Sequence, residues 1–233
     1  MSLAAVGLLA AFGHPALATP IPGYSNLDQL TNPSPATVTL GNYQFSAFTY
    51  NGIPPGGPNP APTPAQISVD APDSPSIGLN FSAPWASVGG FNQESIITYK
   101  VHAINNTPFQ FIFGVGVQFN GAAPVPGSGT YAQEIDTLTD GAGNPIANLP
   151  PIVLYDDGSA ASIDSAMSAP IDPSLQDIIV HKDILVVSGA DGASTISVSN
   201  NTFITPVGNL PEPASLGVFA LASAGLLGRR RRA

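Results

Sequence analysis

The stretch FQFIFGVGVQF, residues 109–119, indicates the fold class of this chain. Its apolar side chains alternate with small or polar ones. This period of two is typical of a β-strand, because successive side chains of a strand point to opposite faces of the sheet. The intervening glutamines and glycines indicate a second face that is partly solvated or closely packed. Asn120-Gly121 follows at once and suits a tight turn between antiparallel strands.

Segments of the same kind lie on both sides of this stretch. They are rich in Val, Ile, Phe, Tyr and Thr, and clusters of Gly, Pro, Asn or Asp bound them. The strands that we expect are Thr37–Tyr50, Gln66–Val69, Ser76–Ala83, Ser95–Ile104, Phe109–Phe119, Tyr131–Leu138, Ile152–Tyr155, Ser159–Met167, Ile178–Val187 and Ser194–Ile204.

Few segments suggest helices. Only Asn26–Leu30 and Pro173–Asp177 indicate helical turns, and residues 53–65 (IPPGGPNPAPTPA) predict a Pro-rich surface loop, because proline cannot donate to a sheet ladder. No repeat of 20–50 residues is visible, which argues against a solenoid or propeller. We therefore predict an all-β body over residues 19–208, an antiparallel β-sandwich with jelly-roll-like connections.

The charges limit the possible partners. Charged residues are only 9% of the chain, while apolar residues reach 43%, a mixture too apolar for a disordered protein. Before the last 25 residues there are 14 acidic side chains and only two basic ones, Lys100 and Lys182. Such a surface repels phosphate, so nucleic acid is excluded as a partner. The chain has no cysteine, which excludes thiol catalysis and Cys-ligated zinc.

The N-terminus reads as a secretion signal over residues 1–18. An apolar run from Leu3 to Phe12 is followed by a helix-breaking Gly-His-Pro segment. Ala16 and Ala18 then occupy the small-residue positions of a signal peptidase site, which predicts cleavage before Thr19. The usual basic start of a signal is missing, so either the signal is minimal or the true start lies upstream. The alternative is a buried N-terminal helix.

The C-terminal segment, residues 209–233, has three parts in order. Pro211-Glu212-Pro213 is followed by an apolar span from Ala214 to Gly228 and then by Arg229, Arg230, Arg231 and Arg232. As a helix this span would be about 22 Å long, against about 30 Å for a bilayer core, and arginine snorkelling would make up part of the difference. We expect a single short transmembrane helix with its arginines in the cytoplasm.

This order of triplet, apolar span and arginine cluster resembles the PEP-CTERM sorting signal of Gram-negative bacteria, with Leu210 where valine is commonest. The resemblance implies recognition by exosortase, a membrane-embedded transpeptidase, and processing at or near Pro211-Glu212-Pro213. It also implies association with exopolysaccharide and biofilm matrix. A Gram-positive sortase signal fits less well, because it requires a Thr-Gly pair that does not follow Leu210-Pro211. A GPI signal also fits less well, because it ends in an apolar segment and not in arginines. A plain membrane anchor remains the alternative.

The body also resembles, more loosely, proteins that carry such tails. The matching features are GLNFS-x-P-W (78–85), the Tyr-x-Val strand (99–101), His-Lys-Asp-Ile (181–184) and the final Asn-Thr-Phe strand. No activity is implied by this resemblance.

No common catalytic motif occurs in the body. HExxH, GxSxG, P-loop and GxGxxG patterns are absent, and we expect His102 and His181 to be exposed strand residues. Glu134 and Asp136 lie two residues apart, so both project from one face of a strand, as in some sandwich-fold glycosidases. Thr139 stands where the last acid of an E-x-D-x-x-E signature would be. A solvated strand face is therefore the expected explanation of the two carboxylates.

Two further segments and three aromatic residues are candidate ligand sites. Residues 140–144 and 155–158 offer oxygens to Ca²⁺ but lack the bidentate Glu of an EF-hand, and turn chemistry explains both. Trp85, Tyr131 and Tyr155 are candidates for stacking on sugars, with core packing as the alternative for Trp85.

Together these observations predict an exported, membrane-tethered and then surface- or matrix-located structural protein. We expect no enzymatic activity, no cofactor and no metal, and exosortase, the inner membrane and extracellular polysaccharide as partners. A carbohydrate-binding module is the alternative, and a glycoside hydrolase centred on Glu134 is a more distant one.

Overall fold

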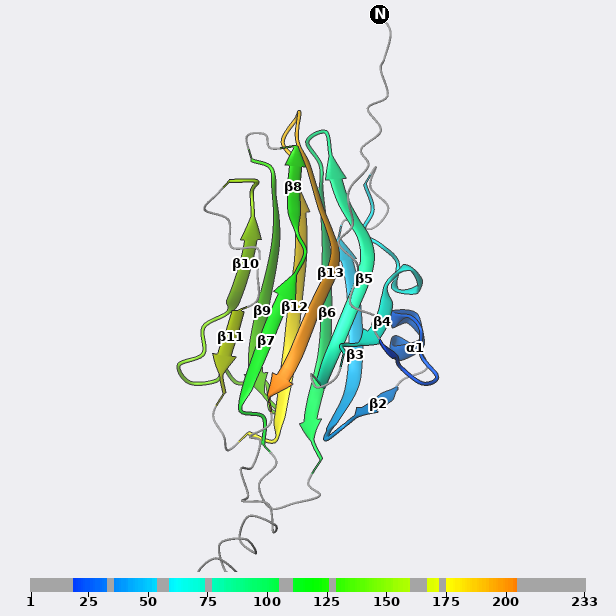
Figure 1. The fold of residues 1–233 in the computed structure, drawn as a ribbon, viewed down its shortest axis with the longest axis vertical. Helices are drawn as coiled ribbons and strands as arrows, with labels where there is room; N and C mark the ends of the chain where they lie inside the picture. Colours follow the sequence, from blue (N-terminus) through cyan, green and yellow to red (C-terminus); the bar gives the residue numbers. More distant parts are fainter. Residues whose placement is uncertain are drawn as a thin grey trace, which may run out of the picture.

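The structure, a computed structural model, describes residues 19–32, 36–53, 59–73, 77–104, 111–125, 129–159, 167–171 and 175–204. These residues form two antiparallel sheets that pack face to face, with a small helical region along one edge (Figure 1). One contiguous hydrophobic core lies between the sheets. The predicted all-β antiparallel sandwich is confirmed.

The seven-stranded sheet contains β1 (Thr19–Pro20), β4 (Ser68–Ala71), β5 (Ile77–Val88), β7 (Gly114–Phe119), β8 (Ala122–Val125), β11 (Met167–Pro170) and β13 (Ala193–Ile204). Its order is β1-β4-β5-β13-β7-β11, and β8 also pairs with β13. The six-stranded sheet contains β2 (Thr37–Leu40), β3 (Tyr43–Ile53), β6 (Asn92–Ala103), β9 (Tyr131–Asp140), β10 (Ile152–Asp156) and β12 (Asp177–Val187), in the order β10-β9-β12-β6-β3-β2.

The period-two pattern of the sequence positions the core. In β6 every second residue from Gln93 to Ala103 is buried, and β9 and β12 show the same alternation. Each strand of the six-stranded sheet therefore has one face toward the core and one toward solvent, as half-buried antiparallel strands should. Tyr99 lies at the centre of this packing, with its ring 5.6–6.3 Å from the rings of Phe45, Phe48 and Phe81.

Several strand boundaries differ from those expected. The segment 37–50 is a hairpin, since Gly41 adopts a φ of 54° and ends β2 before β3 begins. The strand expected at Phe109–Phe119 begins only at Gly114 in the described part, although Val115, Val117 and Phe119 are buried as the alternation predicted. Of the strand expected at Ser159–Met167, only Met167 lies in a described strand, where it opens β11.

The two expected helical turns have different outcomes. Helix α1 (Leu27–Thr31) confirms the first, with Asn26 as N-cap accepting a hydrogen bond from the backbone of Gln29. Near the second, Asp177 belongs to β12 and Leu175 and Gln176 are not helical. The described end of the Pro-rich loop holds a 3₁₀ turn, η1 (Pro64–Gln66), which the prediction did not include.

Strand β5 continues through Pro84, where a strand end was expected. The pairing with β13 shifts at this point, so Ala83 and Pro84 face the single residue Ser197. Such a bulge accommodates proline, which has no N–H to donate. The side chain of Asn120 accepts hydrogen bonds from the backbones of Ser197 and Val198 and so satisfies the β13 side of the bulge.

This continuation places Trp85 in the core, and the interpretation of Trp85 as a sugar contact is wrong. Its side chain is 0% exposed, and its indole Nε1 donates a 3.0 Å hydrogen bond to the hydroxyl of Ser95 on the opposite sheet. A sugar cannot reach a ring that is fully enclosed between two sheets. The alternative of core packing therefore holds for this residue.

The two ends of the chain lie outside the described residues. The expected signal helix over 1–18 and the expected transmembrane helix in 209–233 both fall there. Within the described residues, no helix is long and apolar enough to span a membrane.

Replacing Trp85 with alanine tests its role in the core. We expect Trp85→Ala to lower the free energy of unfolding by about 3–5 kcal/mol, because it removes a large buried side chain and leaves a cavity. Phe91→Ala is the matched control, since the Phe91 side chain is 45% exposed, and it should change stability by less than about 0.5 kcal/mol. Urea denaturation measures both, and equal stability of the two variants would contradict the core position of Trp85.

Candidate functional site

Three ionisable side chains lie together in the core between the two sheets. Glu134 and Asp136 project inward from β9, and Lys182 projects inward from the adjacent strand β12. All three side chains are 0% exposed. Glu134 and Asp136 share one face of a strand as expected, but that face is the buried one, so the interpretation as a solvated strand face is wrong. We call these three residues the buried ionic cluster.

The strand register determines the geometry of the buried ionic cluster. Lys182 and Asp136 are directly opposite each other in the β12–β9 ladder. The Lys182 Nζ lies 3.1 Å from Asp136 Oδ1 and 3.2 Å from Asp136 Oδ2, and it also donates a hydrogen bond to Glu134 Oε1. From the other sheet, the amide of Asn201 donates to Asp136 Oδ2. The hydroxyl of Tyr99 donates to Asn201 Oδ1 at 2.7 Å, so the side chains form one chain of hydrogen bonds.

Burial changes the ionisation of this cluster. Desolvation, assisted by the nearby charge of Asp136, raises the pKa of Glu134 to about 7 against the opposing attraction of Lys182. For Lys182, desolvation alone would lower the pKa, but the two carboxylates outweigh it and raise the pKa above its usual value. The two partners thus favour each other's charged forms, and the dry surroundings oppose the charge on Glu134.

Sequence reasoning missed Lys182. The signal was present in its strand, because Ile178, Val180, Ile184 and Val186 are apolar at alternate positions and Lys182 falls in the same phase. A lysine on the apolar face of a strand requires a buried counter-ion. Its pairing with Asp136 depends on the strand register, which the pattern does not reveal.

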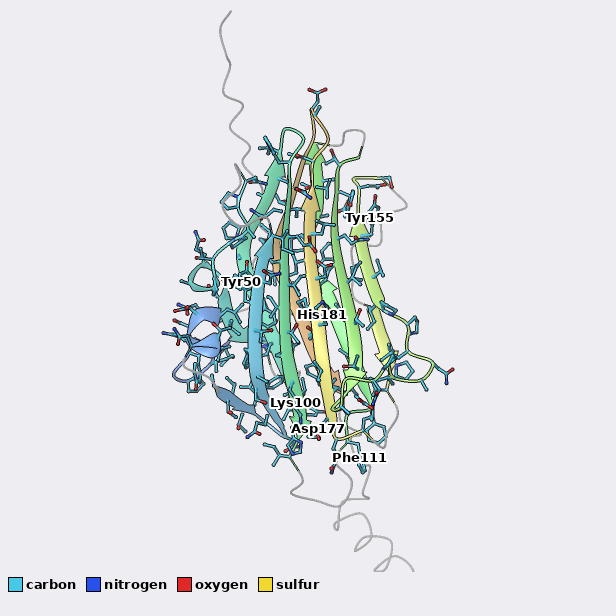
Figure 2. The ribbon with its side chains drawn as sticks, turned by 180° about the vertical axis from the view of Figure 1, so that it is seen from behind. Tyr50, Lys100, Phe111, Tyr155, Asp177 and His181 are labelled. Atoms are coloured by element: carbon cyan, nitrogen blue, oxygen red, sulfur yellow. The ribbon has the colours of Figure 1, made fainter. Side chains whose placement is uncertain are left out.

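The outer face of the six-stranded sheet carries the remaining aromatic candidates. Tyr131 on β9 and Tyr155 on β10 are half-buried, and their ring centroids are 5.4 Å apart with an angle of 32° between the planes. Val153, 38% exposed, lies on the same face two residues before Tyr155. Figure 2 shows Tyr155 and His181 on this sheet. The structure therefore brings Tyr131 and Tyr155 together and separates both from the buried Trp85.

The two histidines also lie on this outer face. His181 is exposed, as expected, and its Nδ1 is 3.0 Å from the hydroxyl of Thr98. His102 is half-buried, and its Nδ1 is 3.0 Å from Asp177, which also pairs with Lys100 at 2.8 Å. Burial would raise the pKa of Asp177, but the hydrogen bonds and charges of Lys100 and His102 outweigh it and lower that pKa.

A carboxylate pair lies near the centre of the same face. Burial, and after it the nearby charge of Glu94 on β6, raise the pKa of Asp183 on β12 to about 6, while the charge of His181 opposes this rise.

In the two loops that are candidates for Ca²⁺ binding, aspartate oxygens accept hydrogen bonds from the backbone of the turn. Asp140 Oδ1 accepts hydrogen bonds from the backbone N–H groups of Ala142 and Asn144, and the hydrogen bonds from Asn144 lower the pKa of Asp140. Asp156 Oδ1 accepts a hydrogen bond from the backbone of Gly158. In the described part of the chain, no three His, Asp or Glu side chains gather in a way that could hold a metal ion.

Most sorting and cleavage residues lie outside the described part of the chain. These are Ala16 and Ala18 of the expected signal site, Pro211, Glu212 and Pro213 of the triplet, and Arg229–Arg232. Thr19, the expected first residue after cleavage, opens β1 and pairs with Ala71 of β4.

Solved structures with some likeness to the chain include two carbohydrate-binding modules. TmCBM61 in complex with β-1,4-galactotriose has 10% identity and a TM-score of 0.35, with 68% of this chain and 88% of that chain covered. The CBM22-1 xylan-binding domain of Paenibacillus barcinonensis Xyn10C has 8% identity and a TM-score of 0.23, with 68% and 86% covered. At these values the likenesses carry no argument about ligand or activity.

The pKa of Glu134 predicts a pH dependence of stability. Its folded-state pKa of about 7 lies above the ordinary 4.5, so its contribution is fully present below pH 4.5 and is lost as the pH rises through about 7. Asp183 also stabilises the folded protein at low pH, and this contribution is lost as the pH rises from 3.8 to about 6. The pKa values of Asp140 and Asp177 are lowered, so their stabilising contributions are lost only when the pH falls below 3.8. We expect the free energy of unfolding to fall between about pH 4.5 and 7.

Denaturation at a series of pH values checks this prediction with Glu134→Gln and Asp183→Asn as a matched pair. Glu134→Gln should flatten the upper part of the decline, toward pH 7, and Asp183→Asn only the lower part. A Glu134→Gln profile that follows the wild type throughout would contradict a protonated Glu134 in the folded core.

The C-terminal tail matches the model of a known sorting motif. Comparison of the sequence with curated proteins yields no match. Residues 209–232 match the family model described as the PEP-CTERM protein-sorting motif. These residues contain the Pro-Glu-Pro triplet, the apolar span and the four arginines. Residues 209–232 of this chain therefore form a PEP-CTERM protein-sorting motif.

Proposed function

We propose that this chain is an exported structural protein of the cell surface or extracellular matrix that exosortase processes at Pro211-Glu212-Pro213. The observation that carries this proposal is the sorting motif at residues 209–232. The β-sandwich of residues 19–204 is then the part delivered to the surface, and residues 214–232 tether it to the inner membrane before processing.

The charges and the apolar segments at the two ends support one orientation. Arg229–Arg232 stay on the cytoplasmic side under the positive-inside rule, which leaves the residues before Pro211 outside. An N-terminal signal cleaved before Thr19 requires the same orientation of the body. The extracellular exopolysaccharide and biofilm matrix is the setting that the sorting motif implies.

The buried ionic cluster supports a non-enzymatic role for the body. A glycosidase needs its two carboxyl groups on either side of a sugar bond. Glu134 and Asp136 are enclosed between the sheets and both contact Lys182. A polysaccharide cannot reach them without opening the core, so we propose a structural rather than a hydrolytic function.

Intact-mass spectrometry of the protein from its native host tests the sorting proposal. We expect a species that begins at Thr19 and ends near Pro211. Glu212→Ala, which disrupts the triplet, should instead retain Arg229–Arg232, whereas Val207→Ala, which lies before the matched motif, should be processed normally. Retention of the four arginines in the wild-type protein would mean a plain membrane anchor and would refute exosortase processing.

A second candidate function is carbohydrate binding on the outer face of the six-stranded sheet. The observation that favours it is the neighbouring pair of rings of Tyr131 and Tyr155. Aromatic rings offer a flat apolar surface with a polar edge, which suits the apolar faces of sugar rings. Glu94, Gln133 and Asp183 on the same face could accept hydrogen bonds from sugar hydroxyls.

Binding of the producing organism's own exopolysaccharide tests this second function. The double variant Tyr131→Ala/Tyr155→Ala should weaken binding at least about tenfold, equivalent to about 1.4 kcal/mol. Phe91→Ala, which removes an exposed ring outside this sheet face, should bind like the wild type. If the wild-type protein does not bind, or if both variants bind equally well, the carbohydrate-binding function is excluded and the structural one is left.

A further inference from the structure

In the buried ionic cluster the amine of Lys182 is in direct contact with the carboxyl group of Asp136. The Nζ is almost equidistant from both oxygens of Asp136, at 3.1 and 3.2 Å. The carboxyl carbon between those oxygens therefore lies close to the separation of roughly 3–3.5 Å that characterises a near-attack geometry. By contrast, Lys182 donates a hydrogen bond to only one oxygen of Glu134.

The charges of the cluster are not balanced when all three groups are ionised. Two carboxylates and one ammonium leave one net negative charge with 0% exposure. Glu134 Oε2 is buried and has no hydrogen-bond partner among the described residues. Isolated charge and unpaired polar atoms are costly in a dry core, and chemistry that removes a pair of charges there is favoured.

We infer that Lys182 and Asp136 condense in the folded core to form a side-chain amide bond, an isopeptide cross-link between β12 and β9, with Glu134 as the proton carrier. This inference is independent of sorting and of sugar binding, because it concerns the core alone.

The reaction requires no partner from outside the cluster. Lys182 passes one proton to Glu134, which hands it to the carboxylate of Asp136, and the neutral Nζ then attacks Cγ of Asp136 and forms the C–N bond. Glu134 takes a second proton from Nζ and gives it to the departing hydroxyl, so that the C–O bond breaks, water leaves and Glu134 ends as the carboxylate it was at the start. The balance is one ammonium and one carboxylate converted to one amide and one water molecule, with no oxidation or reduction.

The surroundings favour each of these steps. Burial raises the pKa of Glu134 to about 7, so that this carboxyl group both accepts and releases a proton near neutral pH. The amide of Asn201 donates to Asp136 Oδ2 and is held in place by the hydroxyl of Tyr99. Such a preorganised donor stabilises the negative charge that develops on that oxygen during attack.

The product suits this chain. The cross-link joins residues 46 positions apart and so restricts the unfolded chain in the way that a disulfide does. Because the chain has no cysteine, disulfides are not available to it. The two strands involved are neighbours, the second and third in the order of the six-stranded sheet (Figure 1), and the bond fixes their register.

Trypsin digestion of the denatured protein tests the inference with an internal control. Lys100 and Lys182 are the only lysines, and the four arginines lie at the C-terminus. We expect cleavage after Lys100 and none after Lys182, because an amidated lysine is not a trypsin site. Mass spectrometry should show a body lighter than its sequence by one water molecule and a branched fragment that joins residue 136 to residue 182.

Two variants identify the reacting groups. Asp136→Asn should form the same bond with loss of ammonia instead of water, since an amide nitrogen then departs. Lys182→Arg keeps the positive charge but not the nucleophile, so the mass should equal that of the sequence and cleavage after residue 182 should return. Glu134→Gln should slow formation of the bond, measured from the time course of water loss in newly synthesised protein.

Specific outcomes would overturn the inference. A folded wild-type protein with full sequence mass and complete cleavage after Lys182 would refute the cross-link. Loss of ammonia from the wild type would make Asn201 the acceptor, and loss of water that persists in Asp136→Ala would make Glu134 the acceptor. Either result would refute the assignment to Asp136. These results do not depend on Lys182→Arg folding, since they are read on the wild type and the aspartate variants.

Discussion

The contact between Lys182 and the carboxylates of Glu134 and Asp136 is the interaction that depends most on the correct arrangement of this fold. A charged amine and two carboxyl groups with 0% exposure are tolerable only where strand register, hydrogen bonds and exclusion of water are all correct. The β12–β9 ladder aligns Lys182 with Asp136, and β13 of the opposite sheet supplies Asn201. Tyr99 then connects the cluster to the aromatic core formed with Phe45, Phe48 and Phe81. The two sheets are thus joined by a polar network inside an apolar core, which disfavours any slip of register.

The body and the tail contribute to the proposed function in different ways. The tail contains the sorting motif, and the body has a polar cluster in its core and a different set of polar and aromatic side chains on its outer face. In the core, the ionisable residues of the buried ionic cluster are enclosed and contribute to the structure of the sandwich. Outside, the six-stranded sheet carries Tyr131 and Tyr155 together with the acidic residues Glu94 and Asp183. A closed sandwich with most of its described acidic groups outside the core and both lysines paired suits the proposed structural role in a matrix of hydrated polymers.

Much of the fold could be predicted from local patterns, because period two identifies strands and the buried face of each. The segments at 95–104, 131–138, 152–155, 178–187 and 194–204 correspond closely to β6, β9, β10, β12 and β13. The predictions that were wrong concern features that depend on pairing between strands distant in the sequence. Trp85 follows a proline and resembled a strand end, yet the bulge opposite Ser197 lets β5 continue and buries the ring. Glu134 and Asp136 were correctly placed on one strand face, but only the position of Lys182 across the ladder shows why that face is buried.

Amine-reactive labelling of the folded protein tests the central claim, which is that Lys182 lies in a closed core against its carboxylates. Lys100 is the control in the same molecule, because its side chain is 37% exposed whereas that of Lys182 is 0% exposed. We predict that the reagent modifies Lys100 and leaves Lys182 unmodified under native conditions, as read by peptide mass spectrometry. Modification of Lys182 at a rate similar to that of Lys100 would mean that water and reagent reach the cluster. That result would contradict both the buried ionic cluster and the fold built around it.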